Sequence, residues 1–328
     1  MRQSSVPPRV TIGMPLYQAE RYLDSAFRSL LGQDHPDFEL VVCDNASTDR
    51  TWEICQRFAA ADPRIRLYRN DSNLGAAANY NRVVALARGE LFRWAAYDDW
   101  CAPSLVSSCV AALDRAGPGV VLAYPQTVLI DENDTVLGPY ADRLDLPDRR
   151  AWRRVGDLMA RFSLCNPVFG VIRTDVLRRT GLIRPYPSSD VTLLAELAAR
   201  GRFHEVPEPL FHRRIHPGSS RQGRGPDRRG LPGVAAWFDP RGRGSVRAPR
   251  LRLTVRSVQA LLGAGAGAGA GEDLGRGARL ACAASFVTRY WLRRARIVAG
   301  RLRRTALGRP ISSSLLVGTQ KGAGDVRT

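Results

Sequence analysis

Strand-like and helix-like patterns alternate through residues 10–124, and this order limits the possible folds more than any other feature of the chain. Short apolar, β-branched runs each precede a longer stretch whose apolar side chains recur at helical spacing. The expected strands are 10–14, 38–43, 65–68, 91–96 and 120–124, and the expected helices are 21–31, 51–61, 76–87 and 105–113. Because parallel strands need crossover connections, this order predicts an α/β, Rossmann-like fold with a mostly parallel central sheet flanked by helices.

The pattern changes after about residue 125. A turn at 131–134 lies in a β-like region; helices are expected over 151–162 and 188–200, and strands over 168–172, 203–206 and 210–215. Beyond Gly218 the chain is rich in Gly, Pro and Arg and contains the run GAGAGAGAG, which is typical of linkers. We therefore expect a folded region over 8–217 with two halves (about 8–125 and 126–217), a linker over 218–278, a helix over 279–305 and a disordered tail over 306–328.

The basic charge is confined to the last third of the chain. The formal net charge of the chain is +18. Residues 1–212 hold 25 arginines and 26 acidic residues, a net charge of −1, whereas residues 213–328 hold 24 basic and five acidic residues, a net charge of +19. The excess has two explanations: a genome that favours arginine codons, or a tail that binds an anionic surface. A nucleic-acid-binding function is not favoured, because the folded region is nearly neutral and carries no recognition motif.

The cysteines and the hydropathy pattern indicate a cytoplasmic protein. The six cysteines form no CxxC pair and are expected to be reduced, mostly buried thiols; they are Cys43, Cys55, Cys101, Cys109, Cys165 and Cys282. No run of 18 apolar residues is present, and the N-terminus lacks the apolar stretch of a signal peptide.

Two adjacent carboxylates, Asp98 and Asp99, directly follow an expected buried strand in the segment RWAAYDDWCAPS. In parallel sheets, ligands bind at the carboxyl ends of the strands. Like charges placed there need compensation, and a hard divalent cation with oxygen ligands supplies it. The alternative is that one aspartate caps the helix after Pro103, although Ser104 lies nearer to that helix.

Four segments in order resemble family 2 glycosyltransferases of the GT-A fold. They are VTIGMPLY from Val10, VCDNASTD from Val42, NLG from Asn73 with Asn79 and Asn81, and Asp98-Asp99. The resemblance covers roughly residues 8–217 and makes 8–125 the nucleotide-binding half and 126–217 the acceptor half. It implies a nucleotide-sugar donor, with UDP or dTDP favoured, a divalent metal (Mn²⁺ or Mg²⁺), and an inverting transfer to a glycan or lipid-linked acceptor.

The same resemblance assigns roles to individual residues. The donor-binding set comprises Pro15, Tyr17, Asp44, Asn73, Gly75, Asn81, Asp98 and Arg214, and the metal set comprises Asp98, Asp99 and His216. Asp44 corresponds to the carboxylate that bonds the base, and its alternative role is to hold a turn. Gly75 fits a close approach of backbone to ligand.

Asp190 corresponds to the base that takes the acceptor proton, and its alternative role is a helix cap. His216 and Arg214 match a loop near the diphosphate, although a lone histidine is usually structural. A further segment resembles the acceptor side with Asn166, Pro167, Phe169 and Gly170.

Two positions depart from the family pattern. Ala96 stands where many relatives have the first acid of the metal motif, and Tyr80 stands where an arginine is common. Because Ala96 replaces that acid, the alternative of a protein that binds a nucleotide sugar without transferring the sugar stays open. A nucleotidyltransferase is the other alternative, but the loop at Gly13 lacks the Gly-rich, basic cradle of that class.

Residues 279–304 have the spacing of a basic amphipathic helix. At 100° per residue, one face holds Leu280, Ala284, Val287, Trp291, Val298 and Leu302, and Arg289, Arg293, Arg296 and Arg303 lie opposite. The helix either lies in an anionic membrane interface or packs on the folded region with its arginines in solvent. The first alternative would bring the enzyme to the inner face of the membrane.

Overall fold

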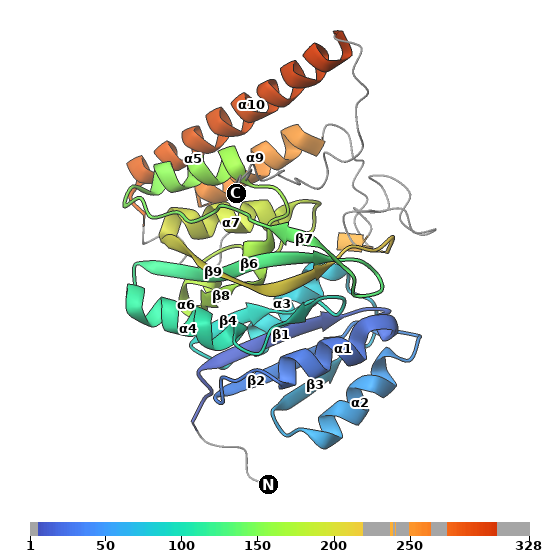
Figure 1. The fold of residues 1–328 in the computed structure, drawn as a ribbon. Helices are drawn as coiled ribbons and strands as arrows, with labels where there is room; N and C mark the ends of the chain where they lie inside the picture. The colour runs from blue at the N-terminus through green and yellow to red at the C-terminus, as the bar shows by residue number, and fades with distance from the viewer. Residues whose placement is uncertain (1–5, 219–236, 239, 241–248, 264–273, 307–328) are drawn as a thin grey trace, which may run out of the picture.

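The computed structural model describes residues 6–218, 237–238, 240, 249–263 and 274–306. Its first half alternates strands and helices as expected (Figure 1). The strands are β1 (Val10–Leu16), β2 (Phe38–Asp44), β3 (Ile65–Arg69) and β4 (Leu91–Trp94), and the helices are α1 (Glu20–Leu31), α2 (Thr51–Ala61), α3 (Ala76–Leu86) and α4 (Leu105–Ala116). The second half adds β5 (Trp100–Cys101), β6 (Val120–Ile130), β7 (Val136–Tyr140), β8 (Val171–Arg173), β9 (Arg202–Arg214), α5 (Ala151–Arg161), α6 (Thr174–Arg178), α7 (Ser189–Arg200) and the 3₁₀ helix η1 (Asn166–Phe169).

The strands form one sheet in the order β3-β2-β1-β4-β8-β6-β9-β5, and β7 pairs with β6. The four strands of the first half run parallel, which brings the carboxyl ends of β1, β2 and β4 to one edge. The pairs of β8 with β4 and β6 are antiparallel, so the sheet is mixed beyond the parallel half. The α/β class with helices flanking a central sheet is therefore confirmed.

The strands expected in the second half differ in their bounds from those of the structure, which also adds β5, β7 and α6. The region expected as strand 168–172 begins as η1, and only Val171–Arg173 joins the sheet. The two expected final strands form the single strand β9, which pairs with β6 through an irregular register. Pro207 and Glu208 lie in the middle of β9, and the strand continues past them because β6 pairs with it on both sides of the irregularity.

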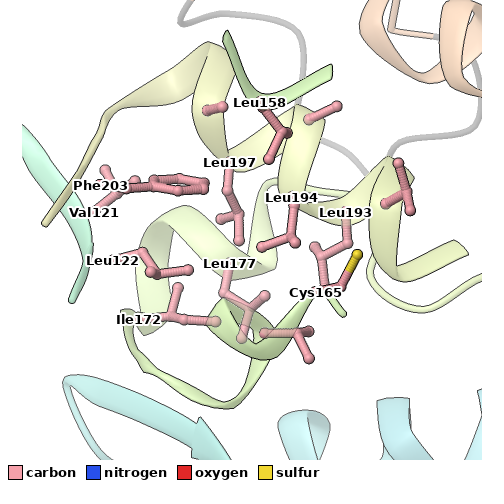
Figure 2. Packing of buried hydrophobic residues seen from close by; sticks show 14 of the residues in the cluster. Val121, Leu122, Leu158, Cys165, Ile172, Leu177, Leu193, Leu194, Leu197 and Phe203 are labelled. Carbon is pink, nitrogen blue, oxygen red and sulfur yellow. The ribbon is translucent and has the colours of Figure 1, made fainter. Parts of the chain in front are cut away.

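The core of the second half lies between the sheet and helices α5, α6 and α7 (Figure 2). Leu122, Ile172 and Phe203 come from the strands, and Leu158 and Leu197 come from the helices. Helix α7 is buried on almost all sides, which explains its run of apolar residues from Val191 to Ala199. The six cysteines are unpaired and buried, as expected.

The span expected to be a linker contains a helix, α9 (Pro249–Leu261), and this part of the domain prediction was wrong. Its buried residues include Leu253, Ser257 and Leu261, which recur at helical spacing. Ser257 Oγ lies 2.7 Å from Thr192 Oγ1 of α7. The helix was not predicted because its short apolar pattern lies between Gly- and Arg-rich stretches that are typical of linkers.

The last helix, α10 (Arg276–Ala306), packs along α5 (Figure 1). Its buried residues are Cys282, Ala283, Phe286 and Tyr290, not the stripe that the spacing suggested. Within the described residues, no helix combines the length and the hydropathy needed to cross a bilayer. The tail expected beyond residue 306 lies outside the described residues.

Candidate active site

The Asp98-Asp99 pair lies between β4 and β5, at the carboxyl end of a parallel strand. Ala95 continues from β4 and donates its backbone N–H to Gly13 O at 2.9 Å, which holds the exit of the strand against β1. Trp100, directly after the pair, stacks on His212 of β9 with ring centroids 3.6 Å apart. The pair is therefore fixed on both sides and faces the end of β9.

Asp98 and His216 come together although 118 residues separate them. His216 Nε2 lies 3.0 Å from Asp98 Oδ2, and the two side chains are 7% and 16% exposed. His216 follows β9, which pairs with β5 and so brings the histidine back to the carboxylates. The sequence-based grouping of these two residues in one site is consistent with this geometry.

Arg214 holds the turn that contains both aspartates. Its backbone N–H donates to Asp99 Oδ1 at 2.8 Å, and its Nε donates to the Asp98 carbonyl at 2.8 Å. Its two terminal nitrogens donate to the Asp131 carbonyl and to Asp134 Oδ1. Each guanidinium nitrogen thus has a partner inside the protein, so the structure gives Arg214 a positioning role, and its contact with a diphosphate stays a prediction.

Asp99 is the buried member of the pair, with 8% of its surface exposed. Burial, and then the charge of Asp98, raise the pKa of Asp99 to about 7. Its Oδ1 is engaged by the Arg214 backbone, so Asp99 supports the turn. A cation beside the pair would favour the ionised form of Asp99.

The sequence did not identify Tyr22 as a site residue, because its spacing marked it only as one position on the apolar face of α1. Its ring lies between the Arg214 guanidinium, 4.4 Å from the ring centroid, and the His216 ring, 5.1 Å away. Its hydroxyl is buried and has no hydrogen-bond partner within the structure. A buried hydroxyl without a partner is costly, so its position beside Asp98 and His216 suggests a ligand that completes the site.

Several residues expected to bind the donor lie at the ends of β1 and β2. Pro15 is in β1, and Tyr17, just past the strand, is 37% exposed. Asp44 is fully buried; it pairs with Arg69 Nε at 3.0 Å and accepts the Ser47 backbone N–H at 3.2 Å. These contacts match the turn-holding alternative for Asp44, and its contact with a base stays a prediction.

A cluster of four asparagines joins these loops, which we call the asparagine cluster: Asn45, Asn70, Asn73 and Asn79. Asn45 Nδ2 donates to Asn73 Oδ1 at 2.8 Å, and Asn70 Nδ2 donates to Asn45 Oδ1 at 2.7 Å. Asn79 Nδ2 donates to the Cys43 carbonyl at 3.0 Å and the Leu16 carbonyl at 3.2 Å. The cluster thus ties the ends of β1 and β2 to α3.

Gly75 adopts a positive φ of 84° at the start of α3. A Cβ there would lie 2.5 Å from Pro240 Cδ and 2.7 Å from the Phe238 carbonyl oxygen. The close approach expected from a ligand is made here by this later part of the chain. Gly75 is therefore required for both its backbone angle and its packing.

Asp190 occupies the first turn of α7 and accepts the Val191 backbone N–H at 2.9 Å. The loop before it is held by Asn81, whose side chain bonds both the N–H and the carbonyl of Ile183, at 3.0 and 2.8 Å. Asn81, expected beside the nucleotide, therefore also positions the segment that carries Asp190. The hydrogen bonds that place Asp98 run instead through Arg214 to β9.

The segment expected on the acceptor side is also held at the end of β9. Arg213 donates to Asn166 Oδ1 at 2.5 Å, and Asn166 Nδ2 donates to Asp142 Oδ2 at 2.9 Å. Asp142, which sequence analysis did not identify, is 4% exposed, and its Oδ1 has no hydrogen-bond partner in the part of the chain that the structure describes. Burial raises the pKa of Asp142 to about 7. The nearby Pro167 lies in η1, and Phe169 accepts a hydrogen bond from Arg93 through its carbonyl.

The two departures from the family pattern have clear positions. Tyr80 packs on Trp94, with centroids 6.3 Å apart; burial raises its pKa, and the charges of Asp98 and Asp99 act in the same direction. Ala96 is half-buried just before the aspartates. In the described part of the chain, no three His, Cys, Asp or Glu side chains gather as a metal-binding group.

Comparison with known proteins places this chain among glycosyltransferases. An uncharacterized glycosyltransferase of Haemophilus influenzae is 24% identical over 218 residues, which are 64% of this chain and 66% of that protein. This chain therefore matches slightly less than two thirds of that relative.

Two solved structures share the fold. Staphylococcus aureus TarS 1–349, in complex with UDP-GlcNAc, has a TM-score of 0.57 at 16% identity and covers 86% of this chain and 72% of its own. The mannosyltransferase PcManGT from Pyrobaculum calidifontis, in complex with GDP-Man and Mn²⁺, has a TM-score of 0.52 at 16% identity and covers 92% of this chain and 81% of its own. The fold is therefore of the GT-A type.

The model of glycosyl transferase family 2 matches residues 11–182, which is more than half of the chain and includes β1 to β8 with both carboxylates. This chain belongs to glycosyltransferase family 2.

Proposed function

We propose that this protein transfers a sugar from a nucleoside diphosphate donor, with UDP or dTDP favoured, to a hydroxyl of a glycan or lipid-linked acceptor, with inversion at the anomeric carbon. The observation that carries the proposal is the Asp98–His216 pair at the carboxyl end of β4, in a chain of this family. The donor complexes of the two structural neighbours support the class of donor.

Asp98 and His216 fit a divalent cation. Asp98 Oδ2 and His216 Nε2 lie 3.0 Å apart, and a carboxylate oxygen and an imidazole nitrogen are donors that Mn²⁺ would accept. With Asp99 in support, the remaining positions would be filled by diphosphate oxygens and water. Bound there, Mn²⁺ or Mg²⁺ would neutralise charge that develops on the leaving diphosphate.

Asp190 would act as the base. The acceptor oxygen forms a bond to the anomeric carbon while the bond from that carbon to the diphosphate oxygen breaks, and the acceptor proton passes to the Asp190 carboxylate. The Val191 N–H and the start of α7 stabilise the negative charge of this carboxylate before the transfer. Asn81 fixes the approach to α7 and therefore the position of the base.

Titration calorimetry with nucleoside diphosphates, with and without Mn²⁺, tests the site. We expect Mn²⁺-dependent binding that weakens at least about 100-fold in Asp98→Ala, because that change removes a ligand and leaves His216 unpaired. Asp175→Ala, an exposed carboxylate on α6, is the matched control and should bind as the wild type does. Equal binding by the two variants would contradict the proposal.

A turnover assay tests the base separately. The asparagine side chain of Asp190→Asn can still accept the Val191 N–H, so we expect wild-type diphosphate affinity with turnover lowered about 10³-fold. Undiminished turnover would remove Asp190 from the mechanism, and retained binding without turnover in the wild type would favour the alternative of a sugar-nucleotide-binding protein.

A further inference from the structure

We propose that the outward side of α10 docks on an anionic lipid bilayer. This outer face is defined by nine exposed residues without charge: Leu280, Ala284, Thr288, Trp291, Leu292, Ala295, Val298, Ala299 and Leu302. At 3.6 residues per turn they lie within an arc of about 120°. The expected membrane stripe of the sequence largely coincides with this face.

Packing of the opposite side fixes the direction of the outer face. Phe286 and Tyr290 are buried against the domain, and the Arg293 guanidinium lies 4.3 Å from the centroid of the Phe162 ring. Figure 1 shows α10 lying on α5 at the end of the molecule away from α2. The helix therefore cannot turn its apolar face inward without losing these contacts.

The outer face is unusually apolar for a surface in water. Leu280 is 61% exposed, Leu302 is 65% exposed and Trp291 is 42% exposed. A tryptophan among leucines on one face of a long helix is typical of the membrane interface, where the indole lies at the level of the headgroups. Exposed alone, such a face is costly, so we infer that a partner covers it.

Charge identifies the partner. Residues 276–306 contain nine arginines and no acidic residue. Exposed Arg289, Arg296 and Arg303 border the outer face on one side, and half-buried Arg294 borders it on the other. Arginines that border an apolar face can reach anionic headgroups while the face enters the acyl boundary.

A second copy of the chain fits this face less well. Two copies paired through α10 would place arginine rows against arginine rows, with no carboxylate on the helix to compensate them. This inference rests on the exposure and charge of α10 and does not depend on the proposed activity.

Vesicle flotation of the full chain tests the proposal, with vesicles of phosphatidylcholine alone or mixed with phosphatidylglycerol. We expect binding to the mixed vesicles only, and a loss of at least about tenfold in the triple variant Leu280→Ser, Trp291→Ser and Leu302→Ser. The triple variant retains every arginine, so it separates insertion of the face from adsorption by arginines elsewhere. The control, Val136→Ser with Leu137→Ser, changes two exposed apolar residues of β7 and should bind as the wild type does.

Quenching of tryptophan fluorescence by brominated phosphatidylcholine in the mixed vesicles locates the contact. We expect quenching in the wild type that is largely absent in Trp291→Phe, because Trp291 is the tryptophan on the outer face. Unchanged flotation of the triple variant, or unchanged quenching in Trp291→Phe, would overturn the proposal. A dimer in solution that the triple variant abolishes, without vesicle binding, would assign the face to a second copy instead.

Discussion

The asparagine cluster and the group formed by Asp98, His216 and Tyr22 both lie past the carboxyl ends of parallel strands, yet their polar atoms are satisfied very differently. In the first, amides bond one another and the backbone over short distances. In the second, the Tyr22 hydroxyl has no hydrogen-bond partner among the described residues, and burial raises the pKa of the supporting Asp99. We infer from this difference that the asparagine cluster maintains the fold, whereas the group of Asp98, His216 and Tyr22 binds a ligand.

The largest expected effect on the second group comes from His216→Ala. We expect Mn²⁺-supported diphosphate affinity to fall about 100-fold, while the free energy of unfolding changes by less than about 1 kcal/mol, because Asp98 remains partly exposed to water. Calorimetry and urea denaturation measure the two quantities. A large loss of stability with unchanged affinity would make the histidine structural.

Asn79→Ala should have the opposite effect to His216→Ala, with a loss of stability as its main consequence. The side chain is buried and bonds two carbonyls at the ends of β1 and β2, so we expect the free energy of unfolding to fall by roughly 2 kcal/mol. Asn133→Ala, in an exposed turn, is the control and should change it by less than about 0.5 kcal/mol. If Asn79→Ala and Asn133→Ala were equally stable, the proposal that the asparagine cluster maintains the fold would be contradicted.

Asp142→Asn should alter the pH dependence of stability. The pKa of Asp142 is about 7 when folded, above its unfolded value of about 3.9. Between these values the native state binds more protons, so its ionisation lowers wild-type stability as the pH rises from about 4 to 7. We expect the variant to be more stable than the wild type by on the order of 1–2 kcal/mol at pH 8, and not at pH 4.

Urea denaturation at both pH values measures this difference. The amide at position 142 can still accept the hydrogen bond of Asn166, so packing should be retained. A variant less stable than the wild type at pH 8 would show that Arg213 stabilises the ionised carboxylate more than burial destabilises it.

Tyr22→Phe should have the smallest effect of these substitutions. It tests whether the Tyr22 hydroxyl contacts the ligand or whether only the Tyr22 ring has a role, through its contacts with Arg214 and His216. Removing a buried hydroxyl without a partner should raise the free energy of unfolding by about 1 kcal/mol in the ligand-free protein. If the hydroxyl contacts the ligand, diphosphate affinity should fall several-fold. Unchanged affinity would confine Tyr22 to its ring contacts with Arg214 and His216.

Much of the first half of the fold could be predicted from the sequence. Its strands are short β-branched runs, its helices have clear periodicity, and parallel order follows from their alternation. The bounds of α2 (Thr51–Ala61) agree with the expected 51–61. The second half was harder, because η1 and the irregular β9 depend on partners distant in sequence.

Sequence by itself determined the α/β class, the family motifs and the identity of the residues that end each strand, because these depend on local spacing and residue type. Only the tertiary structure decided that His216 meets Asp98, that Arg214 holds the turn, and that Tyr22 lies beside them. It also decided which side of α10 faces outward. Such contacts join residues far apart in the chain, and they form only when the whole core fixes the pairing of β5 with β9 and the packing of α10 on α5.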